Sequence, residues 1–268
     1  MSNHSSQFEK GTVLAARFEI LDLIGTGGMS RVYRANDRSS NSAVVIKVPL
    51  PHLLNDREFL IRFQREMRAL VELKHPNIVA ILDIGSVHGI PFAVLPFFPG
   101  GDLNDTRIKV PDGSYKPVRP NSLKTWLPGV SDALDYIHRR RLIHRDIKPA
   151  NILFDADRNP YVADFGIAKI LADSTFARDD FSRTKTGMVL GTPDYLPPEI
   201  IMGQKYDGRA DLFALAVTVY ELLAGRLPFA EDTAAAVLVK QTTTAIPLLP
   251  GNFWNCSVAS ACDRSCLV

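Results

Sequence analysis

One short polar stretch, HRDIKPAN at 144–151, places an acid, a base and an amide at fixed offsets. Apolar residues at 142–143 and 152–154 flank it, so it is predicted to be a polar crossing between two buried segments, a usual setting for catalytic side chains. Asp146 could accept a proton from an attacking hydroxyl, Lys148 could neutralise a transferred group, and Asn151 could bind a metal ion. This division of labour is that of phosphoryl transfer. Any one of these residues alone would more often belong to a solvated turn.

A second acidic position follows thirteen residues after Asn151, where Asp164 opens the sequence DFG at 164–166. The intervening residues predict a hairpin, with strands at 152–154 and 161–163. The two ends of a hairpin lie close together, so this hairpin would bring Asn151 and Asp164 to one site. Carboxylate and amide oxygens suit Mg²⁺, and both residues are therefore candidate metal ligands.

A glycine-rich turn at 25–30 lies between predicted strands 18–24 and 31–35. Glycines there would let backbone N–H groups approach phosphate oxygens without obstruction by a Cβ atom. A plain hairpin turn would carry the same residues.

A third predicted strand, 43–48, contains Lys47, and a helix is predicted over 57–73. Glu66 lies on the same helical stripe as the apolar side chains of that helix. An ionised carboxylate on a core-facing stripe is unfavourable unless a cation meets it, and Lys47 is the candidate partner.

Taken together, HRDIKPAN, the glycine-rich turn, VVIK at 44–47, DFG and the segment 195–199 resemble the catalytic domain of eukaryotic-like, bacterial-type serine/threonine protein kinases. The resemblance implies an α+β, two-lobed fold: a small N-lobe with a five-stranded antiparallel sheet and one helix, and a larger, mainly helical C-lobe. It also implies ATP and Mg²⁺ as cofactors. The chain departs from the family pattern at Ser30, Val45, Pro96 and Pro197.

The resemblance assigns roles to individual residues. Catalysis falls to Asp146, Lys148 and Asn151, and metal binding to Asn151 and Asp164. Regulation by phosphorylation falls to Arg145, Thr184 and Thr186, and substrate binding to Thr192. The residues expected to bind the nucleotide are Ile24, Gly25, Thr26, Gly27, Gly28, Val32, Val45, Lys47, Glu66, Leu95, Phe97, Phe98, Asp102, Leu153 and Asp164.

The chain is expected to divide into a polar extension at 1–13, an N-lobe at 14–98, a C-lobe at 99–245 and an atypical tail at 246–268. The tail has lost helical periodicity, and we interpret it as truncated or frameshifted.

Other elements follow from composition and periodicity. Strands are predicted at 81–86 and 91–95, an exposed loop at 104–121, and helices at 122–138 and 232–242. In the helix at 122–138, Pro128 either introduces a kink or lies in the first turn of a new helix. A further apolar helix begins at Asp211, the expected N-cap and brace of the 144–151 loop, and ends at Gly225.

The composition limits the classes of function that the chain can have. With 268 residues, 46% of them hydrophobic, the chain can bury a large core, and its formal charge of +2 argues against a nucleic-acid partner. No stretch has the length and apolarity of a membrane span, and we expect a cytoplasmic protein. The expected partners are proteins with serine or threonine acceptors, with self-association for autophosphorylation.

Two alternatives to an active protein kinase stay open. One is a catalytically impaired pseudokinase or docking module, suggested only by the atypical tail. The other is a small-molecule kinase of related fold, which would be expected to lack Lys148 in this context and the segment 191–199.

Overall fold

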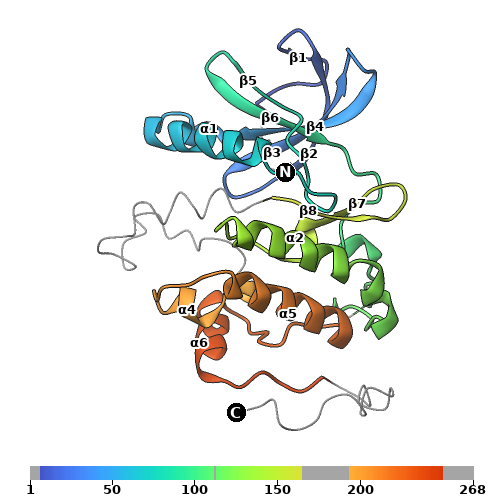
Figure 1. Cartoon of the computed structure of the whole chain (residues 1–268), viewed down its shortest axis with the longest axis vertical. Helices are drawn as coiled ribbons and strands as arrows, with labels where there is room; N and C mark the ends of the chain where they lie inside the picture. Colours follow the sequence, from blue (N-terminus) through green and yellow to red (C-terminus); the bar gives the residue numbers. More distant parts are fainter. Residues whose placement is uncertain (1–6, 112, 165–192, 250–268) are drawn as a thin grey trace.

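The computed structural model describes residues 7–111, 113–164 and 193–249, without the side chains of Arg62, Arg65, Glu66 and Ala69. In this part of the chain a curled sheet and helix α1 form one lobe, and a mainly helical layer with a small hairpin forms the other (Figure 1). The predicted α+β, two-lobed architecture is confirmed.

The N-lobe sheet is antiparallel, with strand order β1-β2-β3-β4-β6-β5. Its strands are β1 (Val13–Leu14), β2 (Phe18–Thr26), β3 (Ser30–Asp37), β4 (Ser42–Pro49), β5 (Asp83–Val87) and β6 (Ile90–Pro96). Five of the six correspond to predicted strands. The sixth, β1, was missed because two residues are too few to show an alternating pattern.

Residues before the predicted boundary at residue 13 also contact the N-lobe. Phe8 is 8% exposed and packs edge-on against Tyr33, with ring centroids 5.8 Å apart. The backbone N–H groups of Gln7 and Phe8 donate to the Tyr33 hydroxyl at 3.0 and 3.4 Å. The segment from Gln7 onward is therefore part of the N-lobe.

Helix α1 (Arg57–Val71) packs its apolar stripe against the sheet, as predicted. Asp56 caps its first turn by accepting a hydrogen bond from the Phe59 N–H at 2.9 Å. Phe59, Phe63 and Met67 are buried on this stripe together with Ala93 of β6.

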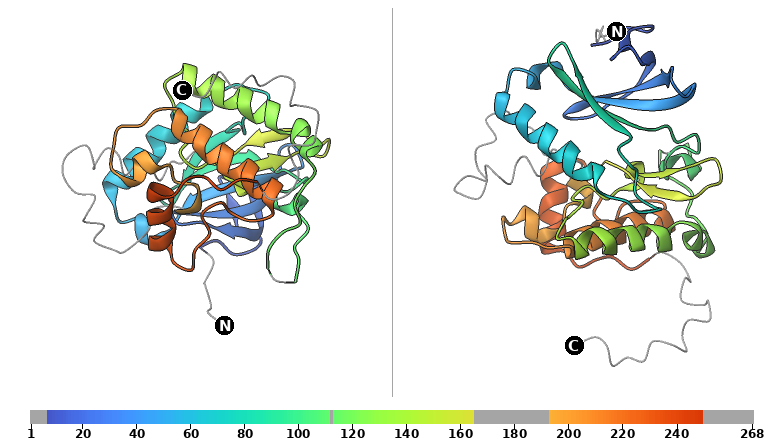
Figure 2. Two further views of the ribbon diagram at one scale, coloured as in Figure 1. Left: turned by 90° about the horizontal axis from the view of Figure 1, so that it is seen from below. Right: turned by 45° about the horizontal axis from the view of Figure 1, so that its top comes forward.

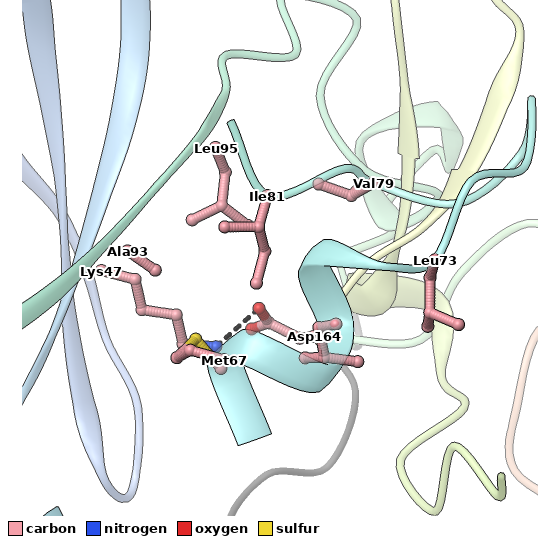
Figure 3. A pocket seen from close by; sticks show the side chains of 9 residues that line it. Lys47, Met67, Leu73, Val79, Ile81, Ala93, Leu95 and Asp164 are labelled. Atoms are coloured by element: carbon pink, nitrogen blue, oxygen red, sulfur yellow. Dashed lines mark hydrogen bonds and ion pairs between the residues drawn. The ribbon is translucent and has the colours of Figure 1, made fainter. Parts of the chain in front are cut away.

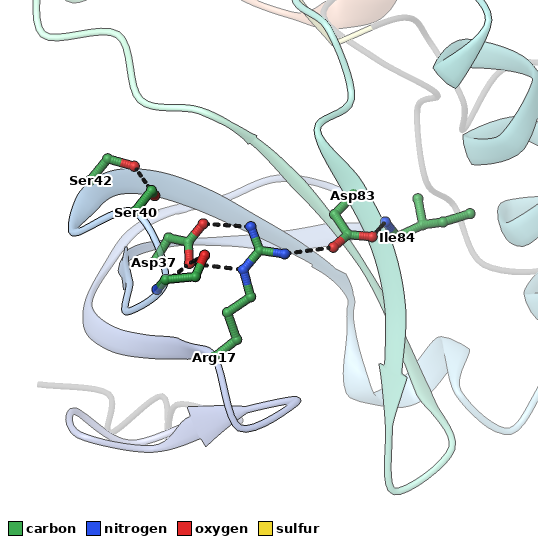
Figure 4. A network of polar contacts seen from close by, with 7 residues as sticks. Arg17, Asp37, Ser40, Ser42, Asp83 and Ile84 are labelled. Atoms are coloured by element: carbon green, nitrogen blue, oxygen red, sulfur yellow. Dashed lines mark hydrogen bonds and ion pairs between the residues drawn. The ribbon is translucent and has the colours of Figure 1, made fainter.

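A polar network ties the two ends of the curled sheet together (Figure 4). Arg17, just before β2, donates to both carboxylate oxygens of Asp37 at the end of β3 and to Asp83 at the start of β5. The hydrogen bond from Arg17 holds the pKa of Asp37 well below its usual range. This network fixes the edge strand β5 relative to the first hairpin.

The C-lobe is built on two long helices, α2 (Leu127–Arg139) and α5 (Arg209–Ala224), which cover the hairpin of β7 (Ile152–Phe154) and β8 (Pro160–Val162) (Figure 2). Short α4 (Pro198–Ile201) lies near one end of α5, and α6 (Ala234–Thr243) packs against α4 below it (Figure 1). One hydrophobic cluster joins α2, α5 and the hairpin, and it includes Ile147 of the 144–151 loop. The loop is therefore anchored in the lobe core.

The start of α2 decides between the two predicted alternatives for Pro128. The helix begins at Leu127, with Pro128 in its first turn, and residues 120–125 form a separate 3₁₀ turn. Proline needs no N–H partner in a first turn, which explains why it begins the helix here without kinking it. Helix α5 ends as predicted at Gly225, which adopts a left-handed conformation with φ of 74°.

The region 104–121 is not a simple exposed loop. Its backbone docks on the end of α5, where Tyr115 N–H donates to the Gly225 carbonyl at 3.1 Å and Val118 N–H to the Leu222 carbonyl at 2.9 Å. Arg107 is buried and pairs with Glu221 of α5 at 2.6 Å. The prediction of an exposed loop rested on the polar composition of this segment. Composition does not show the docking, because the contacts are made by backbone groups and one buried cation.

Candidate active site

Several of the residues predicted to bind the nucleotide lie on one face of the N-lobe sheet. Val32 of β3 is directly opposite Gly25 of β2 and Lys47 of β4. In antiparallel strands, directly opposed residues point to the same face, and so do residues two positions apart. Val45, which is opposite Leu95 of β6, therefore shares this face with Lys47. Hydrogen bonding of the strands thus gathers residues from four separate segments.

Lys47 extends from this face to the other lobe, where its Nζ lies 2.6 Å from Oδ1 of Asp164 (Figure 3). The same pocket is lined by Leu95 and Ala93 of β6 and by Met67 of α1. The Lys47 side chain is only 12% exposed, so its charge is largely removed from water. The Asp164 side chain is 45% exposed, so it is only partly removed from water. Partial desolvation would raise the pKa of Asp164, but the charge and hydrogen bond of Lys47 outweigh that effect, and the net pKa is lowered.

The expected partner of Lys47, Glu66, has a side chain outside the described residues. The ion pair that the structure gives Lys47 is with Asp164. Lys47 and Asp164 therefore face one pocket, although they are 117 positions apart in the chain.

In the 144–151 loop, two side chains contact the carboxylate of Asp146. Lys148 Nζ lies 2.9 Å from Asp146 Oδ2, and Asn151 Nδ2 donates to the same oxygen at 2.9 Å. Asn151 also donates to the Asp146 backbone carbonyl at 2.6 Å and is 5% exposed. All three predicted catalytic residues are thus in direct contact, and the Asp146 carboxylate stays partly open to solvent at 20% exposure.

Asp211 braces this loop from beneath. Its two carboxylate oxygens accept the backbone N–H groups of His144 at 2.8 Å and Arg145 at 2.7 Å. Oδ2 also lies 2.7 Å from Nε2 of His138 at the end of α2. The predicted bracing contact is confirmed. The predicted N-cap is wrong, because α5 begins at Arg209 after Gly208 and Asp211 lies within its first turn.

His144 connects the loop to the segment that carries Asp164. Its Nε2 lies 2.9 Å from the Ala163 carbonyl, and its Nδ1 receives the Asp146 N–H at 3.3 Å. A carbonyl can only accept and an N–H can only donate, so the ring is neutral with its proton on Nε2. Ala163 N–H in turn donates to the Asn151 carbonyl at 2.9 Å. These bonds fix the position of Asp164, whose φ of 55° lies in the sparsely populated left-handed region.

A pH-dependent loss of stability is expected from His144. Burial lowers its pKa in the folded protein, although Asp211 and other groups act in the opposite direction. Below about pH 6.5 the unfolded chain binds a proton that the folded chain does not, so stability falls as pH decreases through this range. Urea unfolding of wild type and His144→Phe at pH 7.5 and 5.5 measures this. The variant should be less stable at both values but lose less between them; an equal loss would contradict the assignment.

The glycine-rich turn has room for a ligand. Gly25 and Gly27 do not have positive φ, and an added Cβ at either would approach protein atoms no closer than 3.8 Å. At Gly28 an added Cβ would meet nothing within 4 Å. The described protein does not require glycine at these positions for its own packing, whereas close approach of a phosphate group to the backbone would. Ile24 directly precedes the turn and is 47% exposed, and Thr26 lies between Gly25 and Gly27 within it.

Phe97 and Phe98, which were predicted to bind the nucleotide, lie directly after β6 in the segment that leads from the N-lobe to the C-lobe. The ring of Phe98 packs against Tyr161 of β8 at 4.7 Å, and the Arg34 guanidinium lies 5.9 Å from the centroid of the Phe97 ring. Leu153 alternates with buried neighbours in β7 and is only half-buried. Asp102 is engaged with the backbone, accepting the Asn104 N–H at 2.7 Å, so its first role here is to cap a turn.

The donor set fits Mg²⁺ bound together with a nucleotide. Within the ranges that the structure describes, no group of three or more His, Cys, Asp or Glu side chains could hold a metal by itself. Mg²⁺ often binds through one or two protein oxygens, substrate phosphates and water. Asp164 and the amide of Asn151 supply oxygens of that type.

Several predicted residues cannot be placed. Thr184, Thr186 and Thr192 lie outside the described residues. Arg145 is described: its guanidinium lies 5.3 Å from the Tyr206 ring, and its φ is 69°. Sequence reasoning missed His138 and His144 as positioning groups, because nothing in a single histidine's sequence context shows which buried carboxylate or carbonyl it will meet.

A sheet lobe with its lysine directed at an aspartate of a helical lobe, above a braced Asp-Lys-Asn loop, defines a protein kinase catalytic domain. The protein kinase domain family model matches residues 18–258, so the chain belongs to this family. The match extends beyond residue 245, into the segment that the sequence pattern separated as a tail.

The relatives are bacterial serine/threonine kinases. The chain is 38% identical to serine/threonine-protein kinase pkn3 of Myxococcus xanthus, over 88% of this chain and 43% of that protein. It is 38% identical to PknB of Mycobacterium leprae, over 84% of this chain and 35% of that protein. Against PrkC of Bacillus subtilis the identity is 35%, over 95% of this chain and 37% of that protein. The chain is thus a catalytic domain of the bacterial serine/threonine type, and it spans roughly two fifths of the length of these relatives or less.

Proposed function

We propose that this chain transfers the γ-phosphoryl group of ATP to serine or threonine hydroxyls of protein substrates. The observation that carries the proposal is the ion pair of Lys47 with Asp164, which brings the sheet lobe and the helical lobe to one pocket. The names of the bacterial relatives support serine and threonine as acceptors.

The protein's contribution is mainly positioning and charge neutralisation. Lys47 and the backbone of the glycine-rich turn would hold the phosphates, with Val32, Val45 and Leu95 on the same sheet face beside the base. Asp146 would orient the acceptor hydroxyl and take its proton. Lys148, which contacts Asp146 at 2.9 Å, would offset charge on the transferred group. Mg²⁺, held by Asp164 and Asn151, would neutralise charge on the phosphate oxygens.

Regulation is proposed for the segment that the structure does not describe. A phosphate on Thr184 or Thr186 adds about −1.5 to −2 charge, and Arg145 beside Asp146 would be its partner. Autophosphorylation between two copies would supply this phosphate. Since ATP is the donor, we place the reaction in the cytoplasm. No helix among the described residues is both long and apolar enough to cross a bilayer.

Removal of the metal tests the proposed reaction. The chain is incubated with γ-³²P-labelled ATP, Mg²⁺ and a generic basic protein, and the labelled amino acids are identified after acid hydrolysis. We expect phosphoserine or phosphothreonine, a loss of labelling to background when EDTA is added, and recovery when excess Mg²⁺ is restored. ATP binding without labelling would favour the docking module, and labelling of small molecules alone would favour a small-molecule kinase.

A further inference from the structure

Arg34 of β3 was not among the residues predicted to bind the nucleotide, yet it lies on the same face of the sheet as several of them. It is directly opposite Val45 of β4, and Val45 is directly opposite Leu95 of β6. Directly opposed residues of antiparallel strands point to the same face, and so do residues two positions apart. The half-buried side chain of Arg34 therefore shares this face with Val45 and Lys47.

Arg34 lies toward the crossing between the lobes, away from the glycine-rich turn. Val32 and Lys47 form one row across the sheet with Gly25, at the end where the phosphates would be held. Arg34 is two positions further along β3, which is about 7 Å in a strand. Its guanidinium carbon lies 5.9 Å from the centroid of the Phe97 ring, directly after β6. This is the end of the face at which the base of a nucleotide would lie.

Asp22 of β2 fixes the orientation of the guanidinium group. Nε and Nη2 of Arg34 donate to the two carboxylate oxygens of Asp22, each at 2.9 Å. Two parallel hydrogen bonds of this kind hold a guanidinium and a carboxylate in a defined relative orientation. The third nitrogen, Nη1, donates to no other group in the part of the chain that the structure describes. Its N–H groups can therefore donate to a ligand.

The ion pair of Arg34 with Asp22 is expected to contribute little to folding. The two side chains are 41% and 46% exposed. Exposed ion pairs contribute little to the stability of a folded protein, because water screens the charges and the side chains lose conformational freedom. Replacement of Arg34 should therefore leave the fold intact, and its effect on ligand binding can be measured separately.

We propose that Arg34, oriented by Asp22 and placed beside Phe97, is a specificity-determining residue that contacts the base of the nucleotide. A guanidinium group is planar, so it can stack on an aromatic ring and donate hydrogen bonds in its own plane. A purine base offers both an aromatic ring system and acceptor nitrogens to such a group. The inference rests on the proposed function and adds to it the part of ATP that Arg34 recognises.

The test compares wild type with Arg34→Met, which keeps much of the length of the side chain and removes its charge and its donors. For this variant we expect the KM for ATP to rise about three- to tenfold, as for the loss of one contact at a partly exposed site. The inhibition constant of adenosine should rise by the same factor, because adenosine carries the base without phosphates. The inhibition constant of inorganic tripolyphosphate, kcat and the KM for the acceptor protein should stay nearly unchanged.

Two further variants separate a contact with the base from a general effect of charge. Arg34→Lys keeps the charge and loses the planar group, so its affinity for adenosine should stay near that of Arg34→Met. Arg38→Ala is the matched control. Arg38 directly follows β3 and forms an exposed ion pair with Glu19 at 3.1 Å. Its replacement removes the same charge from the same strand pair, and this variant should bind adenosine and ATP like wild type.

Three outcomes would overturn the inference: an unchanged inhibition constant of adenosine in Arg34→Met, an equal weakening of adenosine and tripolyphosphate, or a lysine variant that binds adenosine like wild type. If Arg34→Met does not fold, the adenosine affinity of Arg34→Lys decides alone. Wild-type protein that neither binds ATP nor phosphorylates an acceptor would refute the proposed function itself. An active wild type with an unaffected Arg34→Met variant would refute only the role of Arg34.

Discussion

Replacement of Asp146 by alanine is expected to lower phosphoryl transfer by about 10²- to 10⁴-fold, the range for loss of a positioned general base. ATP binding should be nearly unchanged. The Asp146 carboxylate is held by Lys148 and Asn151 within the loop, whereas the pocket between the lobes pairs Lys47 with Asp164. Asp146 should therefore serve the acceptor hydroxyl more than the nucleotide.

The measurement pairs steady-state labelling of an acceptor protein with titration of a fluorescent ATP analogue. Asp135→Ala is a suitable control, since Asp135 is an exposed residue of α2. Asp146→Asn keeps the size of the side chain and removes its basicity, so it should be nearly as inactive as the alanine variant. A loss of nucleotide affinity as large as the loss of transfer would contradict this role for Asp146.

Replacement of Asp211 by alanine is expected to cost about 3–5 kcal/mol of unfolding free energy at pH 7, because it leaves one buried and one partly buried backbone N–H group without an acceptor. Asp211 is 1% exposed and accepts from the backbone of both His144 and Arg145. Transfer should fall as well, since the loop carrying Asp146 loses its brace. Asp211→Asn, which keeps one acceptor oxygen, should lie between wild type and Asp211→Ala.

Urea unfolding measures this cost. Asp207→Ala is the matched control, because Asp207 precedes the same helix but its side chain is 60% exposed; its loss should stay below about 1 kcal/mol. The pH dependence gives a second readout. Burial would raise the pKa of Asp211, but the hydrogen bonds from His138 and from two backbone N–H groups together lower it. The stability from Asp211 is therefore present above about pH 4 and lost as pH falls below this value, and Asp211→Ala should lack that loss. An alanine variant as stable as Asp207→Ala would contradict the bracing role.

The catalytic loop and the strands could be predicted because their information is local. Asp146, Lys148 and Asn151 lie within six consecutive positions, so their contact follows once the loop is recognised. The alternation of Val44, Ile46 and Val48 with Val45 and Lys47 assigns the faces of β4 before any partner strand is known.

Features that depend on distant partners could not be predicted. The docking of Arg107 on Glu221 joins residues 114 positions apart, within a segment whose composition is typical of loops. Gln241 donates hydrogen bonds to backbone carbonyls of the turn Pro193–Tyr195. Every residue has a backbone carbonyl, so no pattern of side chains in the sequence predicts these hydrogen bonds. For Lys47, the helical stripe predicted a carboxylate partner, but only the fold shows that Asp164 comes within 2.6 Å.

The central claim is that both lobes contribute to one metal-nucleotide site, and paramagnetic NMR tests it most directly. ATP with Mn²⁺ in place of Mg²⁺ is added to isotope-labelled protein, and broadening of backbone amide signals is measured. We expect the strongest broadening at Asp164, Asn151 and the glycine-rich turn, with little at His88 on the outer edge of the sheet. Strong broadening at His88, or at only one of the two lobes, would contradict the account.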